Sequence, residues 1–210
     1  MDSLVPVPEE IKIIVIGDSN VGKSSLLTRF CNQQYNEHQQ TTVGSEHYAR
    51  DLRTEQGLVK LNLWDTAGQE RFRAISKTFY RRSDAALLVF DWTNAKSYGS
   101  LWSYWSTEVQ KVCEDIPLVV VANKCDLESS MDIEEVREEC DRRNVCLIRT
   151  SCVSGNGVED VFRHISSEVL VRRVQAANEA VSLDTIAGSS LYLQRQAPHE
   201  PASRGYCCGY

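Results

Sequence analysis

The sequence predicts an α/β fold: a mostly parallel six-stranded sheet with one antiparallel edge strand and helices on both faces. The first observation is that short apolar, β-branched runs alternate with longer segments of helical spacing. The second is a hairpin-length interruption early in the chain, where two strand-like segments follow each other directly. A chain of 210 residues with 42% hydrophobic content suits one well-buried domain followed by a tail.

The candidate strands are apolar runs of four to six residues, a length typical of strands buried on both faces. They cover residues 11–16, 59–64, 85–90, 118–122 and 145–148. A sixth strand comes from residues 42–63, where two strand-like segments are separated only by residues 53–57. That separation fits a hairpin and is too short for a crossover, so one edge strand should be antiparallel.

Apolar residues keep helical spacing in four segments that lie between or after these strands. The segments are residues 26–30, 101–112, 133–140 and 158–169. We interpret Trp92, Trp102 and Trp105 as packing residues and not as ligand contacts, since large aromatic side chains in such patterns usually fill the core.

The chain divides by composition into four parts. Residues 1–10 form an N-terminal extension, and residues 11–175 carry the folded domain. Beyond about residue 176 the apolar periodicity fades into Gly, Ser, Pro and Gln, which predicts a flexible linker over 176–206. Residues 207–210 are a separate paired-cysteine ending.

Charge and cysteine usage exclude several classes of protein. A net charge of -6 and a pI near 5.3 argue against a nucleic-acid binder, which needs a clustered basic surface. The N-terminus has no secretory signal pattern, and no apolar run approaches the length of a membrane span. The scattered cysteines have no CxxC spacing, so we expect them to be reduced and mostly packing; they are Cys31, Cys113, Cys125, Cys140, Cys146 and Cys152.

A phosphate-binding loop follows the first strand. Residues 17–24 fit G-x-x-x-x-G-K-[ST] and lead into a helix, the context this motif requires. Gly17 and Gly22 let the backbone N–H groups turn toward phosphate oxygens, Lys23 reaches the β- and γ-phosphates, and the Ser24 hydroxyl ligates Mg²⁺. A dinucleotide site is excluded because the third loop residue is not glycine. The other loop residues expected to contact the nucleotide are Ser19, Asn20, Val21 and Ser25.

Two further motifs stand at the carboxyl ends of strands, where open α/β sheets bind ligands. After residue 64, Asp65 suits Mg²⁺ held through water, Gly68 offers an N–H to the γ-phosphate, and Gln69 orients an attacking water. Residues 123–126 read Asn-Lys-Cys-Asp. The carboxylate of Asp126 can accept from guanine N1–H and from the 2-amino group, which adenine does not offer.

The chain resembles the Ras superfamily in residues 17–24, 64–69 and 123–126 taken together. The sequence of residues 64–73 resembles the Rab family in particular. The resemblance covers about residues 11–170. It implies that the domain over 11–175 is a P-loop GTPase domain, or G domain.

The same resemblance implies further site residues. Thr42 would join the Mg²⁺ shell and meet the γ-phosphate, with Thr41 the less favoured neighbour. Tyr35 would place a ring at the guanine, and Lys124 would cover the base with its stem. A backbone N–H of the Ser151 and Cys152 pair would meet guanine O6. The base-recognition set is then Asn123, Lys124, Asp126, Ser151 and Cys152.

Three positions depart from the Rab pattern. Asn20 replaces a usual Gly beside the phosphates, which leaves the hydrolysis rate open. His47 replaces a usual Phe on the effector surface, and Val153 replaces a usual Lys in the last guanine loop.

The last four residues resemble the CCXX termini on which Rab proteins carry two geranylgeranyl groups. Cys207 and Cys208 would be the lipidated residues. The ending is not C-a-a-X, because a second Cys and a Gly occupy the aliphatic places.

The resemblance implies a GTP/GDP switch that uses Mg²⁺, hydrolyses GTP slowly and regulates vesicle and membrane trafficking. It also implies a guanine exchange factor, a GTPase-activating protein, effectors, a Rab escort protein and a dissociation inhibitor. The expected location is the cytoplasmic face of an intracellular membrane, with a cytosolic pool and no nucleic-acid partner. The alternative is a GTP-binding interaction module with little or no hydrolysis, which Asn20 favours and Gln69 opposes.

Overall fold

A computed structural model describes residues 9–37, 42, 44–66, 79–113, 115–129 and 131–195, with side chains described up to residue 179. The chain separates into two compact units, Met1–Leu170 and Val171–Tyr210. The sheet and the helices that pack against it belong to the first unit.

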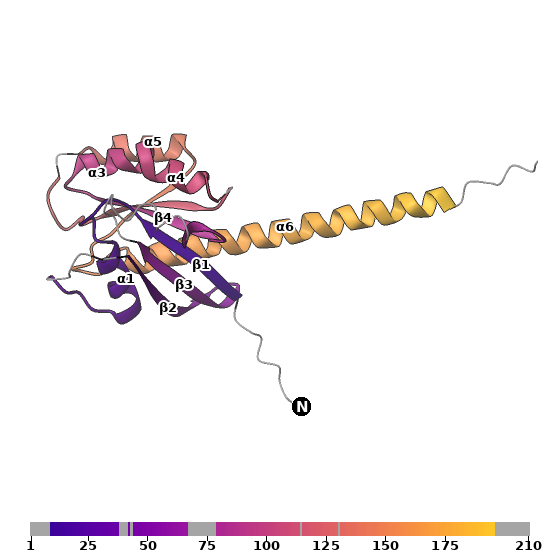
Figure 1. The fold of residues 1–210 in the computed structure, drawn as a ribbon, viewed down its shortest axis with the longest axis horizontal. Coiled ribbons are helices and arrows are strands. Elements are labelled where there is room, and N and C mark those ends of the chain that lie inside the picture. The colour runs from indigo at the N-terminus through magenta and orange to yellow at the C-terminus, as the bar shows by residue number, and fades with distance from the viewer. Residues whose placement is uncertain are drawn as a thin grey trace, which may run out of the picture. The chain divides into compact units, whose positions relative to one another are not determined.

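The sheet has six strands in the order β2-β3-β1-β4-β5-β6 (Figure 1). All neighbouring pairs are parallel except β2 and β3. The predicted mostly parallel sheet with an antiparallel edge strand is therefore confirmed. The strands are β1 (Glu9–Ile16), β2 (Ser45–Thr54), β3 (Gly57–Thr66), β4 (Ala85–Asp91), β5 (Leu118–Asn123) and β6 (Cys146–Arg149).

The edge strand is joined to its neighbour by a tight hairpin. The antiparallel register runs without interruption from the Ser45 and Thr66 pair to the Thr54 and Gly57 pair. Gly57 has a φ of 134°, a backbone conformation that favours glycine. The hairpin therefore brings Ser45 next to the carboxyl end of β3.

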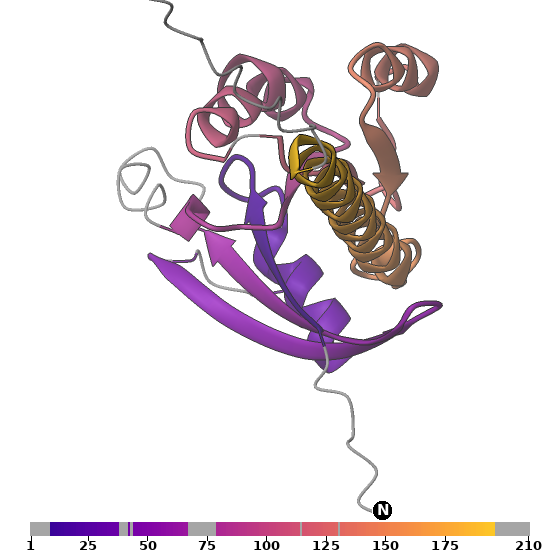
Figure 2. The same ribbon diagram turned by 90° about the vertical axis from the view of Figure 1, so that its right-hand side faces the viewer.

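Helices cover both faces of the sheet (Figures 1 and 2). They are α1 (Lys23–Asn32), α3 (Ala95–Ser100), α4 (Ser106–Gln110), α5 (Ile133–Arg142) and α6 (Val158–Arg195), with a π-helical turn η2 (Leu101–Trp105) between α3 and α4. Ile13 and Val15 pack in the core shared with α1 and the start of α6. Ile14 and Ile16 face the other core, which η2, α4 and α5 complete. This alternation is the period of two that strand geometry imposes.

The ends of the folded segments differ from the sequence-based boundaries. β1 begins at Glu9, and α6 continues to Arg195, so residues 176–195 are helical where a flexible linker was predicted. The segment contains several Ala and Leu residues and no proline, which favours a helix, although Gly188 and the serines at 182, 189 and 190 are weaker helix formers. The rest of the linker and the cysteine ending lie outside the described residues. None of the described helices combines the length and hydropathy that crossing a membrane requires.

Candidate functional site

The phosphate loop connects β1 to α1, and its two glycines are required by space as well as by conformation. Gly17 has a φ of 149°, and a Cβ there would lie 2.1 Å from the carbonyl oxygen of Val89. Gly22, at a φ of 95°, begins α1, and a Cβ there would lie 2.3 Å from Nδ2 of Asn123. A larger residue at either place would displace the backbone that is expected to meet phosphate.

Lys23 is buried and bends back over the loop. Its Nζ donates to the carbonyl oxygens of Gly17 (2.9 Å) and Asp18 (2.7 Å). Burial lowers the pKa of Lys23 to about 8, while the carboxylates of Asp65 and Asp18 act in the opposite direction. The ammonium group is thus held inside the loop, where phosphate oxygens would be its strongest partners.

Asn20 has an exposed side chain and a φ of 64°. Glycine adopts this left-handed conformation without steric cost. Asparagine is among the few other residues that adopt it readily. Asn20 is therefore compatible with the backbone conformation of the loop.

Ser24, Thr42 and Asp65 come together from three different segments. The hydroxyl oxygens of Ser24 and Thr42 lie 2.6 Å apart. Ser24 donates to Oδ2 of Asp65, and Thr42 donates to the same oxygen at 3.2 Å. Burial is the largest influence on Asp65 and raises its pKa, although the Ser24 hydrogen bond and the Lys23 charge counteract it. The structure thus brings together all three residues expected at the metal.

This cluster fits Mg²⁺. Oδ1 of Asp65 is buried and has no hydrogen-bond partner among the described residues, an arrangement that is costly for a carboxylate oxygen unless a ligand completes it. Two hydroxyls and a carboxylate are the hard oxygen donors that Mg²⁺ selects, with phosphate oxygens and water filling the remaining positions.

Asn123 joins the phosphate loop to the loop after β6. Its side chain is 1% exposed, and Nδ2 donates to the carbonyl oxygen of Val21 at 2.9 Å. Oδ1 accepts from the hydroxyl of Thr150 (3.0 Å) and the thiol of Cys152 (3.3 Å). Burial raises the pKa of Cys152 to about 11, so this thiol remains protonated and able to donate. Asn123 therefore links the phosphate loop to the loop after β6 through buried hydrogen bonds.

Lys124 has a partner that the sequence did not reveal. Its Nζ lies 2.6 Å from Oδ2 of Asp91, the last residue of β4. Burial opposes ionisation of Asp91, but hydrogen bonds from Lys124 and Thr93 outweigh it and lower the pKa of that carboxyl. The ion pair fixes the lysine stem in place. Asp91 directly follows the predicted apolar run 85–90, so its place at the carboxyl end of a strand was a signal for a site residue, although not for its pairing with Lys124.

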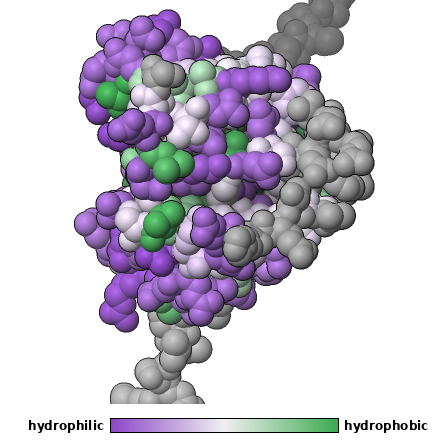
Figure 3. Space-filling view, turned by 90° about the vertical axis from the view of Figure 1, so that its left-hand side faces the viewer, coloured by the Kyte–Doolittle hydropathy of each residue, from purple (hydrophilic) through white to green (hydrophobic). Residues whose placement is uncertain are grey.

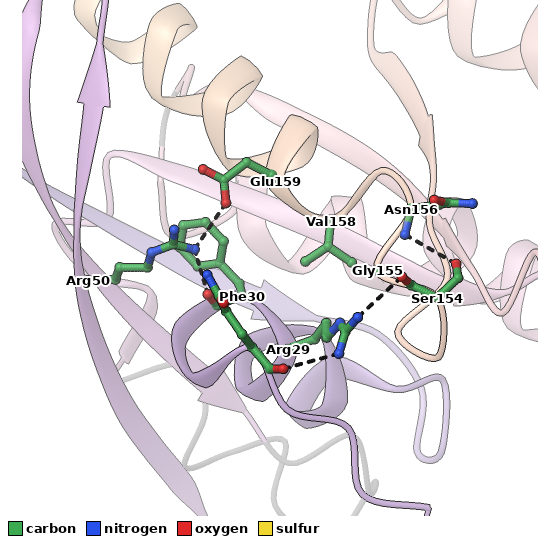
Figure 4. A pocket seen from close by; sticks show the side chains of 9 residues that line it. Arg29, Phe30, Arg50, Ser154, Gly155, Asn156, Val158 and Glu159 are labelled. Carbon is green, nitrogen blue, oxygen red and sulfur yellow. Dashed lines mark hydrogen bonds and ion pairs between the residues drawn. The ribbon is translucent and has the colours of Figure 1, made fainter.

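The loop from Ser151 to Gly157 is folded against α1. The N–H of Gly155 donates to the carbonyl oxygen of Ser151 at 2.8 Å. Arg29 donates to the carbonyl oxygens of Ser154 and Gln33, both at 3.2 Å. Figure 4 shows the arginine spanning the gap between α1 and this loop, at a pocket of about 370 Å³. Arg29 thus ties the loop that carries Ser151 and Cys152 to the end of α1.

Comparison with known proteins decides the family. The Ras family profile matches residues 12–171. The chain is 30% identical to the Ras-related protein Rab11A of Lotus japonicus, over 99% of the chain and 95% of that protein. It is 32% identical to Rab-7b of Paramecium octaurelia, over 94% and 96%, and to Rab-11A of Dictyostelium discoideum, over 94% of each. The chain belongs to the Rab group of the Ras family of small GTPases.

In this Rab-type GTPase, two further residues predicted for the base site stand at the surface. Tyr35 is 42% exposed, and Asp126 is exposed. Partial burial raises the pKa of Tyr35, with further contributions from Glu37, Cys152 and Asp126. Tyr35 is therefore close enough to Asp126 and Cys152, two residues predicted for the base site, for their charges to affect its pKa.

His47, predicted to lie on the effector surface, belongs to a row of rings. The rings of His47 and Trp64 have centroids 5.0 Å apart, and those of Trp64 and Phe79 lie 5.2 Å apart. The His47 ring thus packs beside Trp64, as an aromatic residue at this position can. On the face drawn in Figure 3, the described residues are mostly hydrophilic and the hydrophobic ones stand apart from one another.

Several predicted residues cannot be compared with the geometry. Gly68, Gln69 and Thr41 lie outside the described residues, as do Cys207 and Cys208. Their assignment stays a prediction.

Proposed function

We propose that this Rab-type GTPase is a GTP/GDP-cycling switch for intracellular vesicle and membrane trafficking, with slow Mg²⁺-dependent hydrolysis as its timer. The convergence of Ser24, Thr42 and Asp65 carries the proposal. Thr42 stands in the segment before β2, so a ligand that holds Thr42 against α1 and β3 also orders the chain leading to the edge strand.

Each part of the site has a distinct role in the proposal. Residues 19–25, Lys23 among them, bind the phosphates, and Ser24, Thr42 and Asp65 (through water) would hold Mg²⁺. The metal would supply positive charge that offsets the negative charge of the phosphates. Gly68 meets the γ-phosphate. Loss of that phosphate removes the shared anchor of Thr42 and the Gly68 segment, which is how hydrolysis resets the switch.

Guanine recognition falls to the loops after β5 and β6. Asp126 accepts two hydrogen bonds from the base, and a backbone N–H of Ser151 or Cys152 meets O6. The stem of Lys124 and the ring of Tyr35 cover the base, and the ion pair of Lys124 with Asp91 (2.6 Å) supports this arrangement. Asn123 keeps both loops in register with the phosphate loop.

The partners follow from the Rab assignment. They are a guanine exchange factor, a GTPase-activating protein, effectors, an escort protein and a dissociation inhibitor. Geranylgeranyl groups on Cys207 and Cys208 attach the protein to the cytoplasmic face of an intracellular membrane, with a cytosolic pool.

Single-turnover GTP hydrolysis tests the proposal, with Mg²⁺ and with a chelator. Hydrolysis should be slow, should require Mg²⁺, and should become slower still in Gln69→Leu while GTP remains bound, because leucine cannot orient water. Ser24→Asn should weaken Mg²⁺-dependent GTP binding. Ser103→Asn, an exposed serine on η2, is the matched control and should resemble the parent. GTP binding without any hydrolysis would favour the interaction module.

A further inference from the structure

Asp18 places a carboxylate in a loop that is expected to bind phosphates. A negative charge beside a polyphosphate is unfavourable unless it is directed elsewhere. In the structure it has a specific partner: the indole Nε1 of Trp105 donates to Oδ1 of Asp18 at 2.8 Å, across 87 positions of sequence. This contact links the phosphate loop to the segment from α3 to α4.

Trp105 is a rigid donor. Its side chain is 1% exposed and packs in the core formed with Leu101 and Val109, and its ring meets that of Tyr104 edge-on at 5.0 Å. It closes the π-helical turn η2, where the N–H of Ser106 donates to the carbonyl oxygen of Leu101. Isolated π-helical turns within helices are frequent at functional positions.

The backbone of Asp18 is held as firmly as its side chain. The carbonyl oxygen of Asp18 accepts from Nζ of Lys23 at 2.7 Å, and the preceding Gly17 has no room for a side chain against Val89. Asp18 therefore lies between two fixed donors, the indole of Trp105 and the ammonium of Lys23. One residue thus joins η2, through its side chain, to the lysine, through its backbone carbonyl.

We propose that Trp105 is a positioning residue of the nucleotide site: its indole N–H holds the Asp18 carboxylate against η2 and thereby fixes the phosphate loop and Lys23. This role rests on the proposed binding of phosphates by residues 17–24. Without this contact, the loop that positions Lys23 loses its attachment to η2, and bound nucleotide should leave faster.

The test compares GDP dissociation rates, measured with a fluorescent GDP displaced by excess GDP in Mg²⁺. Trp105→Phe keeps an aromatic ring and deletes the donor, so GDP should dissociate roughly tenfold faster, the effect of losing one hydrogen bond to a charged group. Asp18→Ala should speed dissociation to a similar extent. Asp18→Asn keeps an Oδ1 acceptor and should stay close to the parent.

Two controls separate positioning from general loss of packing. Val109→Ala removes a fully buried side chain from the same helical segment and should lower the thermal midpoint without changing GDP dissociation. Trp102→Phe alters an indole whose contacts are with Tyr98 and Arg143, and should leave the dissociation rate unchanged.

The double variant Trp105→Phe with Asp18→Ala decides the mechanism. If the two residues act through one contact, the double variant should release GDP no faster than the faster single variant. Multiplied effects, parent-like release from Trp105→Phe, or equal acceleration in Val109→Ala would each overturn the proposal. Failure of the parent to bind GDP at all would instead overturn the proposed function, and this inference with it.

Discussion

Asn123 is hydrogen-bonded to Val21 at 2.9 Å, so the residue that opens the proposed base-recognition motif also supports the backbone of the phosphate loop. The same side chain fills the space that a Cβ on Gly22 would need. The two halves of the nucleotide site are therefore built as one unit, and a change in either half reaches the other.

Replacing Asn123 with Ala should weaken both halves of the site. The carbonyl of Val21 and the hydroxyl of Thr150 would each lose a buried partner. The free energy of unfolding should fall by about 1 to 3 kcal/mol, and GDP should dissociate faster. Urea unfolding and GDP release measure the two effects. Asn62→Ala, which removes an exposed contact with Glu10, should change stability by less than about 0.5 kcal/mol. If both changes affected stability and GDP release equally, Asn123 would not have this linking role.

Changing Asp126 to Asn should alter base selectivity. The carboxylate accepts two guanine donors in our proposal, whereas an amide offers one acceptor and one donor group. Affinity for GDP should fall by at least tenfold and affinity for xanthosine diphosphate should rise, since the 2-oxo group accepts from the new amide. Competition binding measures both. Asp160→Asn, on an exposed position of α6, is the control. An unchanged preference for GDP would remove Asp126 from base recognition.

Lys23 predicts a pH dependence of nucleotide affinity. Its pKa in the folded, nucleotide-free protein is about 8, below the ordinary 10.5. Between these values the unfolded chain keeps a proton that the folded chain has lost, so stability without nucleotide should rise with pH there. Phosphates favour the charged lysine, so GDP affinity should fall as pH rises through 8, approaching about tenfold per unit.

Calorimetric titration with GDP from pH 7 to 9 measures this slope. Lys23→Arg keeps its charge throughout the range, so any slope that it retains comes from the nucleotide or from other groups. If GDP affinity changed with pH in the same way for the parent and for Lys23→Arg, Lys23 would not titrate in this range.

Membrane residence should depend on Cys207 and Cys208 together. Residues 171–206 contain four arginines against three acidic residues, which gives no polybasic cluster to bind anionic lipid. One lipid chain alone binds marginally, with a partition constant on the order of 10⁴ M⁻¹ for myristoyl. The double Cys→Ser variant should therefore be recovered in the soluble fraction, with GDP binding intact. Ser203→Ala should stay with membranes. Pelleting of the double variant after a high-salt wash would point to a protein receptor.

The periodicity of the sequence was sufficient for the sheet, because buried parallel strands are apolar and the hairpin gap is short. The glycines of the phosphate loop were also predictable, because a motif of neighbouring residues determines the backbone conformation there. The pairs of Asp91 with Lys124 and of Asp18 with Trp105 were not predictable. They join residues 33 and 87 positions apart, and only the topology brings them together.

The interpretation of Trp105 as a packing residue was correct but incomplete. A hydropathy pattern reflects the apolar ring of tryptophan but does not indicate where its single indole N–H points. The extent of α6 was missed for the opposite reason. Apolar periodicity predicts helices that pack against a core, whereas residues 176–195 are helical without such a pattern.

The β2 and β3 hairpin has a mechanical consequence. Thr42 precedes the Ser45 end of β2, and Asp65 pairs with Glu46 at the same end of the ladder. Both strands are therefore fastened at one end by the groups that would share the metal, while the far end closes in the turn at Gly57. β2 is the edge strand and is paired on one side only, whereas β3 is also held by β1, so the Ser45 end of β2 should open first when that contact is lost. Amide hydrogen exchange at residues 45–47 should thus be fast without the triphosphate and slow with it, while exchange at residues 52–59 stays the same.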